Sequence, residues 1–364
     1  MKIEVKQENL SKALSAVSRV ASTRGQMPIL ADILLKIEDG QLVVAATNLE
    51  MSITEKISAK VDQEGIVAVP ARLITEFINN LPHVPVKIEN KDRKINISAG
   101  GFNSIINGGD SDEFPALPEV ENSDELIIPS DIFRESVSSV APVASSDITR
   151  PILTGVYLHS SDGELIMAAT DGYRLAERKL LKTKLDINAI IPSSTLNEVS
   201  RLITDGDKNI TIKISDEQIS FQIGDVNLIS RLIDGKFIAY QQLIPSNTDF
   251  SILANKNELV RAVKVAGIFA GTSTGSVVLK TDAKKQTISI TALASELGEN
   301  NAEIEAEISG DQDGLVTLNS KFLLDALNFI SSETIHIRFS GKLAPVLITG
   351  KDDIYNHIIM PVKS

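Results

Sequence analysis

The side chains that most often perform catalysis or bind metals are sparse and scattered in this sequence. Histidine occurs only at His83, His159, His336 and His357, and no two of these have the spacing of a metal site or of an HExxH motif. Cysteine is absent, which excludes a disulfide framework, a thiolate nucleophile and a Cys-ligated metal. We therefore expect the four histidines to be structural.

Loops that bind phosphate or calcium are equally hard to find. No GxxxxGK[ST] loop occurs, and no GxGxxG follows a predicted strand. The run GDQDGLVTLNS from Gly310 begins like a calcium loop, but it lacks the acidic residue that closes one, so we expect a turn between strands. The sequence thus predicts no cofactor and offers no good candidate for a catalytic centre.

The most unusual polar segment, AATDGYRLA from Ala168, has a second copy in the chain. AATNLEMSI begins 123 residues earlier at Ala45, and the match extends without a gap over thirty residues from Pro28 and Pro151, with eleven identities. Each block has the pattern of a strand, an Asp-Gly turn, a second strand, a short polar break and a third strand. Taken alone, Asp171-Gly172 is typical of a strand-end turn.

Helical patterns flank these blocks at a constant period. Those that begin at Val69, Ile191 and Leu318 follow one another at intervals of 122 and 127 residues, and three more begin near Asn9, Pro129 and Asn255. The chain is therefore predicted to consist of three repeated domains, 1–120, 121–245 and 246–364. Helices that alternate with hairpin-linked strands predict an α+β fold of antiparallel sheets.

Composition limits the class of protein further. A chain of 364 residues with 43% hydrophobic and 23% charged residues is typical of a folded soluble protein. The opening MKIEVKQENL carries charges where a signal peptide would be apolar, and no apolar stretch is long enough to cross a membrane. We expect a cytoplasmic protein without a membrane partner.

Charge is distributed unevenly along the chain. The formal net charge is −12, yet the predicted helical segments carry ten basic and seven acidic residues. A mildly basic helical layer could contact phosphates without reading bases, although exposed helices of a solvated surface would look the same. Because aromatic residues are only 4% and Trp is absent, stacking on nucleic-acid bases is not expected.

The threefold repeat, the TDGYRLAE block and the carboxyl end YNHIIMPVKS together resemble the bacterial sliding clamp, the β subunit of DNA polymerase III. The resemblance covers the whole chain, from MKIEV through RGQMPIL, VPARL and LIDGKF to IIMPV. It implies three clamp-type domains with antiparallel sheets outside and two helices per domain inside, which form half of a closed ring. It also implies that two subunits join head to tail around duplex DNA, and that nothing is catalysed.

The resemblance further implies a pocket that binds short peptides of partner proteins. Those partners would be the polymerase III catalytic subunit, the clamp loader, and repair and ligation proteins. The matching positions are Leu153, Thr170, Gly172, Tyr173, Arg174, Leu175, Ile238, Tyr240, Leu243, Val346, Ile358 and Met360. The usual Phe-Pro-Asp-Tyr of this pocket is replaced by Phe237-Ile238-Ala239-Tyr240, and Gln241-Gln242 stand where basic residues are frequent.

Positions for contacts with DNA and with a second subunit follow from the same resemblance. Arg24, Arg72 and Arg150 match basic family positions for sequence-independent contact with duplex DNA, whereas Ser193 and Ser194 replace residues that are commonly basic. The homodimer interface would pair an edge strand, at Ser104 and Ile106, with a helix that carries Ile268 and Phe269.

Two other functions remain open at this point. The repeats could form a peptide-binding scaffold that does not encircle DNA, which would keep the pocket but lose topological retention. Alternatively, an enzyme site could form between repeats, although this would need a convergent cluster of ionisable groups that the sequence does not offer.

Overall fold

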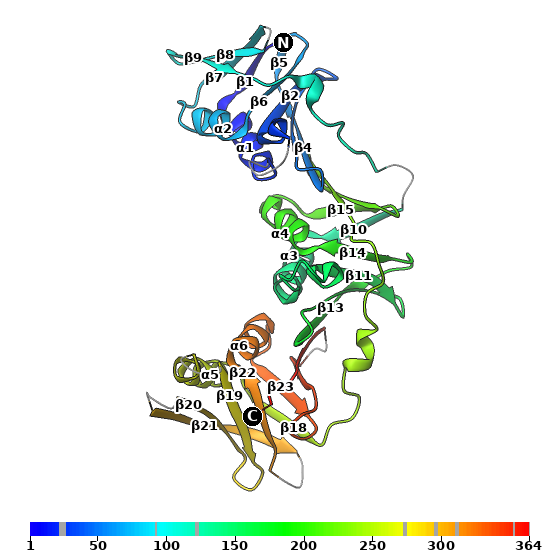
Figure 1. The fold of residues 1–364 in the computed structure, drawn as a ribbon, viewed down its shortest axis with the longest axis vertical. Helices are drawn as coiled ribbons and strands as arrows, with labels where there is room; N and C mark the ends of the chain where they lie inside the picture. Colours follow the sequence, from blue (N-terminus) through cyan, green and yellow to red (C-terminus); the bar gives the residue numbers. More distant parts are fainter. Residues whose placement is uncertain are drawn as a thin grey trace. The chain divides into compact units, whose positions relative to one another are not determined.

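The structure is a computed structural model that describes residues 1–21, 27–91, 93–120, 124–271, 275–294, 298–309, 313–351 and 354–363 (Figure 1). By its internal contacts the chain divides into two compact units. Unit 1 contains residues 1–133 and 194–232, and unit 2 contains residues 134–193 and 233–364. No helix among the described residues is long and apolar enough to cross a membrane.

The two copies of the repeated block fold as predicted, into three strands each. The first copy forms β2 (Asp32–Glu38), β3 (Gln41–Thr47) and β4 (Met51–Ser58), and the second forms β11 (Gly155–Ser161), β12 (Glu164–Thr170) and β13 (Arg174–Lys182). In the first hairpin Asp39 and Gly40 have φ of 51° and 74°, and in the second Asp162 and Gly163 have 52° and 78°. Two consecutive positive φ values are those of a type I′ turn, for which Asp-Gly is a preferred pair.

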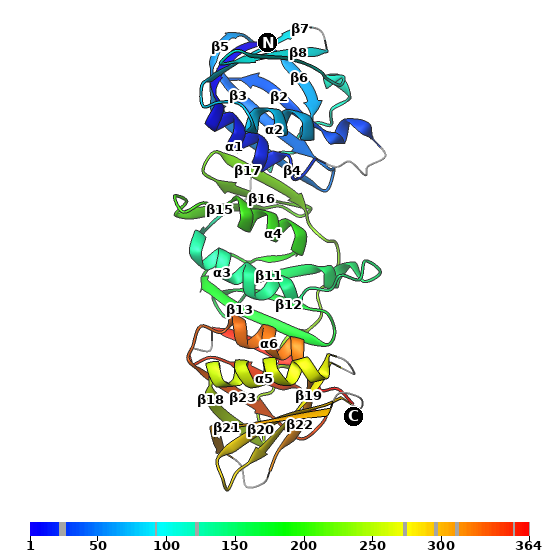
Figure 2. The same ribbon diagram turned by 90° about the vertical axis from the view of Figure 1, so that its left-hand side faces the viewer.

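All six predicted helices are present. They are α1 (Gln7–Val17), α2 (Ala71–Asn79), α3 (Ser130–Val140), α4 (Ser193–Leu202), α5 (Lys256–Ala270) and α6 (Ser320–Phe329). In α1 the residues at helical spacing, Leu10, Ala13, Leu14 and Val17, are completely buried. Figure 2 shows α1 beside α2 in unit 1 and α5 beside α6 in unit 2, and in both pairs the two helices are in contact.

Unit 1 contains two antiparallel sheets. The smaller has the order β5-β1-β7-β8-β9, and the larger has the order β10-β15-β16-β17-β4-β3-β2-β6. The additional strands are β1 (Lys2–Lys6), β5 (Lys60–Gln63), β6 (Ile66–Pro70), β7 (Pro85–Lys91), β8 (Lys94–Ala99), β9 (Phe102–Asn107), β10 (Glu125–Pro129), β15 (Asn209–Ile214), β16 (Gln218–Ile223) and β17 (Val226–Arg231). The larger sheet is continuous because β4 pairs with β17, from Met51 opposite Ser230 to Glu55 opposite Val226. We call this pairing the first junction.

Unit 2 contains one antiparallel sheet of twelve strands. Its order is β14-β11-β12-β13-β25-β24-β23-β18-β21-β20-β19-β22. The additional strands are β14 (Asn188–Pro192), β18 (Phe250–Asn255), β19 (Ser276–Asp282), β20 (Thr287–Ala294), β21 (Gly298–Ser309), β22 (Leu315–Asn319), β23 (Thr334–Phe339), β24 (Val346–Thr349) and β25 (Tyr355–Ile359). Here β13 pairs with β25, from Arg174 opposite Ile359 to Arg178 opposite Tyr355, which we call the second junction.

A short segment accompanies each junction. We call residues 114–120 the first strap and residues 237–243 the second strap; they begin with Phe114 and Phe237, which are both buried and 123 positions apart. The second strap ends in a turn of 3₁₀ helix, Tyr240–Leu243, whereas residues 115–120 of the first have no regular structure.

Candidate functional site

The turn between β12 and β13 is held by its own side chains. The Thr170 hydroxyl donates to the carbonyl of Arg174 at 2.6 Å and accepts from the amide of Gly172 at 3.1 Å. The Asp171 carboxylate accepts from the amides of Tyr173 and Arg174 at 2.8 and 3.0 Å. Gly172 has φ of 93°, a conformation that glycine adopts without strain. The local sequence therefore determines the shape of this turn.

The first copy of the block makes nearly the same turn. Asn48 accepts from the amides of Glu50 and Met51, and the Thr47 hydroxyl donates to the Met51 carbonyl. Leu49 occupies the position of Gly172 and also has positive φ, 75°. The turn is thus a property of the repeated fold, and a difference in function between the copies must come from what surrounds each one.

Arg174 fixes the second turn to the neighbouring helix α6. Its side chain is buried, and it donates to Asp171 at 3.1 Å, to Asp325 of α6 at 2.6 Å and to the carbonyl of Pro142 at 2.9 Å. The guanidinium carbon also lies 4.4 Å from the ring centroid of Phe322. With these partners Arg174 supports the turn, and it is not a freely accessible surface cation.

Exposed apolar side chains lie on this anchored turn, directly after β25 next to it and on the second strap. Tyr173 is 65% exposed, and its carbonyl accepts from the amide of Met360, whose residue is 38% exposed. On the second strap Ile238 and Leu243 are each 42% exposed, while Leu153 is half-buried. Large apolar side chains that remain in contact with water near one another are typical of interaction sites.

The other predicted pocket residues lie beneath this surface. Thr170, Leu175, Tyr240, Val346 and Ile358 are each no more than 2% exposed. Leu175, Tyr240 and Ile358 belong to one buried cluster that also contains Phe237 and Leu347. The predicted residues therefore divide into an accessible set and a buried supporting set, which the sequence does not distinguish.

Aromatic packing holds the second strap in place. The ring of Phe237 stacks on Tyr157 with centroids 4.9 Å apart, and Tyr157 stacks on His159 at 4.4 Å. The Nε2 atom of His159 is 2.8 Å from the hydroxyl of Tyr240, which is completely buried. Burial, and then the Glu177 carboxylate nearby, raise the pKa of Tyr240, and burial lowers the pKa of His159. His159 is structural, as predicted, but its strap partner could not be identified from the sequence.

A second buried histidine lies on β25. The Nδ1 atom of His357 is 2.7 Å from the hydroxyl of Tyr355, which also donates to the carbonyl of Ser139 at 3.2 Å. Both residues are buried, with an exposed fraction of 3% for Tyr355 and 0% for His357. Burial, with a smaller contribution from the charge of Arg174, lowers the pKa of His357 to about 3.

The arginines predicted for DNA contact lie in different surroundings. Arg72 is exposed on α2 and pairs with Glu76 at 2.9 Å. Arg150 pairs with Asp147 at 3.0 Å, and its Nη1 would be 3.5 Å from a Cβ added to Gly172, so it lies beside the β12–β13 turn. Arg24 lies outside the described residues.

The residues predicted for a subunit interface are partly accessible. On the edge strand β9, Ser104 is half-buried and Ile106 is buried, whereas Phe102 and Ile105 are 54% and 68% exposed. These two residues are not among the predicted ones, although strand alternation places Ile105 on the face opposite to Ile106. On α5, Ile268 is 72% exposed and Phe269 is half-buried.

The chain matches known protein families over nearly its whole length. Family models of the DNA polymerase III beta subunit match the chain in order: the N-terminal domain over residues 1–118, the central domain over 127–238 and the C-terminal domain over 241–363. The chain belongs to the DNA polymerase III beta subunit family. Its function is accordingly that of a DNA sliding clamp, and the predicted family and fold class are confirmed.

Individual relatives agree over the full length of the chain. The beta sliding clamp of Bacillus subtilis is 30% identical over 382 residues, and that of a Staphylococcus epidermidis strain is 28% identical over 376, with both chains completely covered in each comparison. The solved sliding clamp of B. subtilis has a TM-score of 0.95 at 28% identity, covering 100% of this chain and 99% of its own. A Pseudomonas aeruginosa sliding clamp bound to griselimycin has a TM-score of 0.93 at 25% identity, with both chains fully covered.

The Arg174 anchor predicts a cost for removing the charge of its partner on α6. We expect Asp325→Asn to lower the free energy of unfolding of unit 2 by about 1–3 kcal/mol, because the buried guanidinium of Arg174 would lose a charged acceptor. Urea unfolding followed by circular dichroism measures this loss. Glu76→Gln is the matched control, because it breaks the exposed ion pair with Arg72. It should leave the midpoint urea concentration of unfolding unchanged. Equal midpoints for both variants would contradict a supporting role for Arg174.

The buried His357 predicts a pH dependence of stability. Because its pKa falls from 6.5 to about 3, the folded chain binds fewer protons than the unfolded chain between these values, so stability is lost as pH decreases below 6.5. One such group costs about 1.4 kcal/mol per pH unit in that window. We expect His357→Phe to reduce the loss between pH 7 and pH 5, measured by urea unfolding. His83→Phe changes an exposed side chain and is the control; between pH 7 and pH 5 this variant should lose as much stability as the unsubstituted protein. If His357→Phe also loses the same amount, groups other than His357 cause the pH dependence.

Proposed function

We propose that two copies of this chain join head to tail into a closed ring that encircles duplex DNA and gives processivity to the polymerase it tethers. The observation that carries this proposal is the presence of three consecutive clamp domains in one chain, so that two chains supply six. We place the domain boundaries at 1–120, 121–245 and 246–364. A heterologous interface closes into such a ring if each subunit covers half of the circle.

The proposed contact between subunits uses β9 of one copy and α5 of the other. Ser104 and Ile106 were assigned to this interface together with Ile268 and Phe269. The exposure of Phe102, Ile105 and Ile268 supports the assignment, because an edge strand with accessible apolar side chains would otherwise favour aggregation. We add Phe102 and Ile105 to the proposed interface.

DNA is held without sequence preference in this proposal. Arg24, Arg72 and Arg150 would contact phosphates. Ser193 and Ser194, at the start of α4, supply no charge. Direct binding would then be weak, and the salt dependence should decrease by about one unit for each phosphate contact that is absent. Retention on DNA would depend on the closed ring, which does not need tight contacts.

The apolar surface around Tyr173 is the proposed docking site for partner peptides. The partners would be the polymerase III catalytic subunit, the clamp loader, and repair and ligation proteins that carry a short peptide with a glutamine and apolar anchors. Met360 can adapt to several such anchors because its side chain is flexible. Ile238 in place of the usual proline, and Gln241 and Gln242 in place of basic residues, would change the preference of the site but keep its apolar character.

Tethering is a binding function and requires no chemical step. We therefore propose that the clamp has no catalytic activity and needs no cofactor, and that it acts in the cytoplasm. The described residues contain no group of three or more His, Cys, Asp or Glu side chains that could hold a metal ion.

The ring proposal predicts the mass of the particle and its behaviour on DNA. Light scattering after size exclusion should give twice the 39.3 kDa mass of the chain, and clamps loaded by a clamp loader onto nicked circular DNA should leave when the circle is cut. Ile268→Asp should give monomers and abolish retention, because it buries an unpaired charge in the interface. Ile148→Asp, at a side chain that is 84% exposed, is the matched control. A chain that stays monomeric at micromolar concentration would favour the peptide-binding scaffold.

The docking site predicts which side chains determine peptide affinity. Met360→Ala and Leu243→Ala should each weaken binding of a labelled peptide with one glutamine and two leucine anchors by about fivefold to tenfold, since each removes apolar contact area. Fluorescence anisotropy measures the dissociation constants. Ile127→Ala changes an exposed isoleucine in unit 1 and should have no effect. If all three variants bind equally, the peptide site lies elsewhere.

A further inference from the structure

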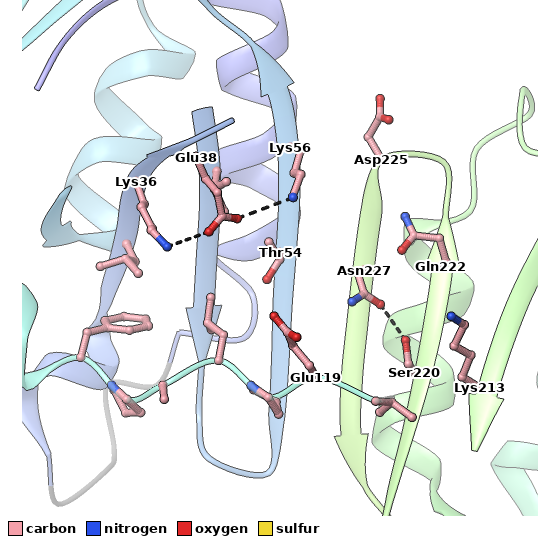
Figure 3. Close-up of a pocket in the computed structure, with 18 of the residues that line it drawn as sticks. Lys36, Glu38, Thr54, Lys56, Glu119, Lys213, Ser220, Gln222, Asp225 and Asn227 are labelled. Carbon is pink, nitrogen blue, oxygen red and sulfur yellow. Dashed lines mark hydrogen bonds and ion pairs between the residues drawn. The ribbon is translucent and has the colours of Figure 1, made fainter. Parts of the chain in front are cut away.

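A cavity of about 860 Å³ lies beneath the first strap, entirely within unit 1 (Figure 3). Its walls are the strap and one face of the larger sheet around the first junction. Leu34, Val43, Phe114 and Leu117 make one side apolar, and Lys36 and Thr54 are among its polar lining residues. Neither the resemblance of the chain nor the proposed peptide site accounts for this space.

At the second junction, aromatic side chains fill the space that is equivalent to this cavity. A shift of 123 residues, the period of the repeat, relates Leu34, Lys36 and Leu117 to Tyr157, His159 and Tyr240. These three are the side chains that form the stacked and hydrogen-bonded aromatic group under the second strap. At the first junction each is replaced by a residue without a ring.

At two further positions in the wall of the cavity, the side chain is smaller than its counterpart at the second junction. Thr54 occupies the position of Glu177, with the same shift of 123 residues. Ser220 lies opposite Ile229 on β17, just as Leu347 lies opposite Ile358 on β25, so Ser220 is the counterpart of Leu347 in the buried cluster of the second junction. The cavity is therefore the space that smaller or ring-free side chains leave open in an otherwise repeated structure.

The two straps are also held differently. In the second strap the amide of Tyr240 donates to the carbonyl of Ile238, and the carbonyl of Gln241 accepts from the amide of Ile244, the residue that follows the strap; Tyr240 is completely buried. In the first strap the buried cluster contains Phe114, with Leu117 only partly buried against it. An occupant beneath the first strap would need to displace little existing structure.

The polar groups of the cavity match the hydroxyl of a phenol. At the second junction the hydroxyl of Tyr240 lies 2.8 Å from His159, whose counterpart here is Lys36, a donor that is 2.7 Å from Glu38. Thr54 and Glu119 both point into the gap between strap and sheet (Figure 3), and a carboxylate can accept from a phenol. We propose that the cavity beneath the first strap is a binding pocket for an aromatic ring that carries a hydroxyl, such as a tyrosine side chain.

Ligand-observed saturation-transfer NMR with p-cresol, the tyrosine side chain as a free molecule, tests this proposal on the full chain. We expect binding with a dissociation constant of about 1 mM, as for other ligands of this size, and weaker binding of toluene, which lacks the hydroxyl. Leu117→Tyr should reduce p-cresol binding at least roughly tenfold, because it restores the ring that the second strap carries. Leu73→Ala, which shortens an exposed side chain on α2 in the same unit but outside the cavity, is the matched control and should bind p-cresol normally.

The outcomes separate this pocket from other sites. If Leu117→Tyr does not fold, as judged by circular dichroism, Ser220→Leu restores another wall residue of the second junction and should also reduce binding. Equal p-cresol signals in the unsubstituted protein and in a folded wall variant would place the ligand elsewhere and overturn the proposal. No saturation transfer at about 10 mM p-cresol, well above the expected dissociation constant, would overturn it as well.

Discussion

Strand pairing between successive repeats is the interaction on which the rest of this structure depends. At the first junction five residues of β4 pair with five of β17, and at the second the equivalent five residues of β13 pair with five of β25. Each pairing joins strands distant in sequence into one sheet, so that the backbone groups of β4 and β13 are satisfied where an isolated domain would expose an edge. The straps and the β12–β13 turn take their positions from these two pairings.

An ion pair accompanies each junction, and its arginine lies in a different element at the two junctions. Glu198 of α4 and Asp325 of α6 are each the sixth residue of their helix, and they bind Arg19 and Arg174 respectively. Arg19 belongs to the segment that follows α1, and its equivalent position in the next repeat is Pro142, whose carbonyl accepts from Arg174. The acidic acceptor thus has the same helix position at both junctions, whereas the donor follows α1 at the first junction and lies in the strand turn at the second, where it supports the proposed docking site.

The two copies of the repeated block share one turn conformation but differ in their surroundings. Both turns use a Thr and an Asn or Asp to satisfy the same backbone groups. Among the described residues, only the second turn carries an arginine that binds a neighbouring helix, together with the exposed side chain of Tyr173 and the nearby Met360. Its surroundings come from other parts of the chain, among them Pro142 before the turn and Asp325 and Met360 after it, so the same turn conformation can serve the proposed docking site.

The sequence by itself determined the repeated elements. The Asp-Gly turns, the six amphipathic helices and the antiparallel strands depend on contacts between residues close in the chain, whose patterns are visible in a linear sequence. It also identified most of the side chains of the proposed docking site, but not which are accessible, because strand alternation cannot tell which face of a sheet a later segment will cover. Only the tertiary structure decided that Val346 and Tyr240 are buried while Tyr173 is exposed, that Ile105 faces outward in place of Ile106, and that Asp325 anchors Arg174. The Arg174–Asp325 anchor joins residues 151 positions apart, and no local pattern can show such a contact. Which face of the β8–β9 hairpin is covered likewise depends on the segments that pack against it.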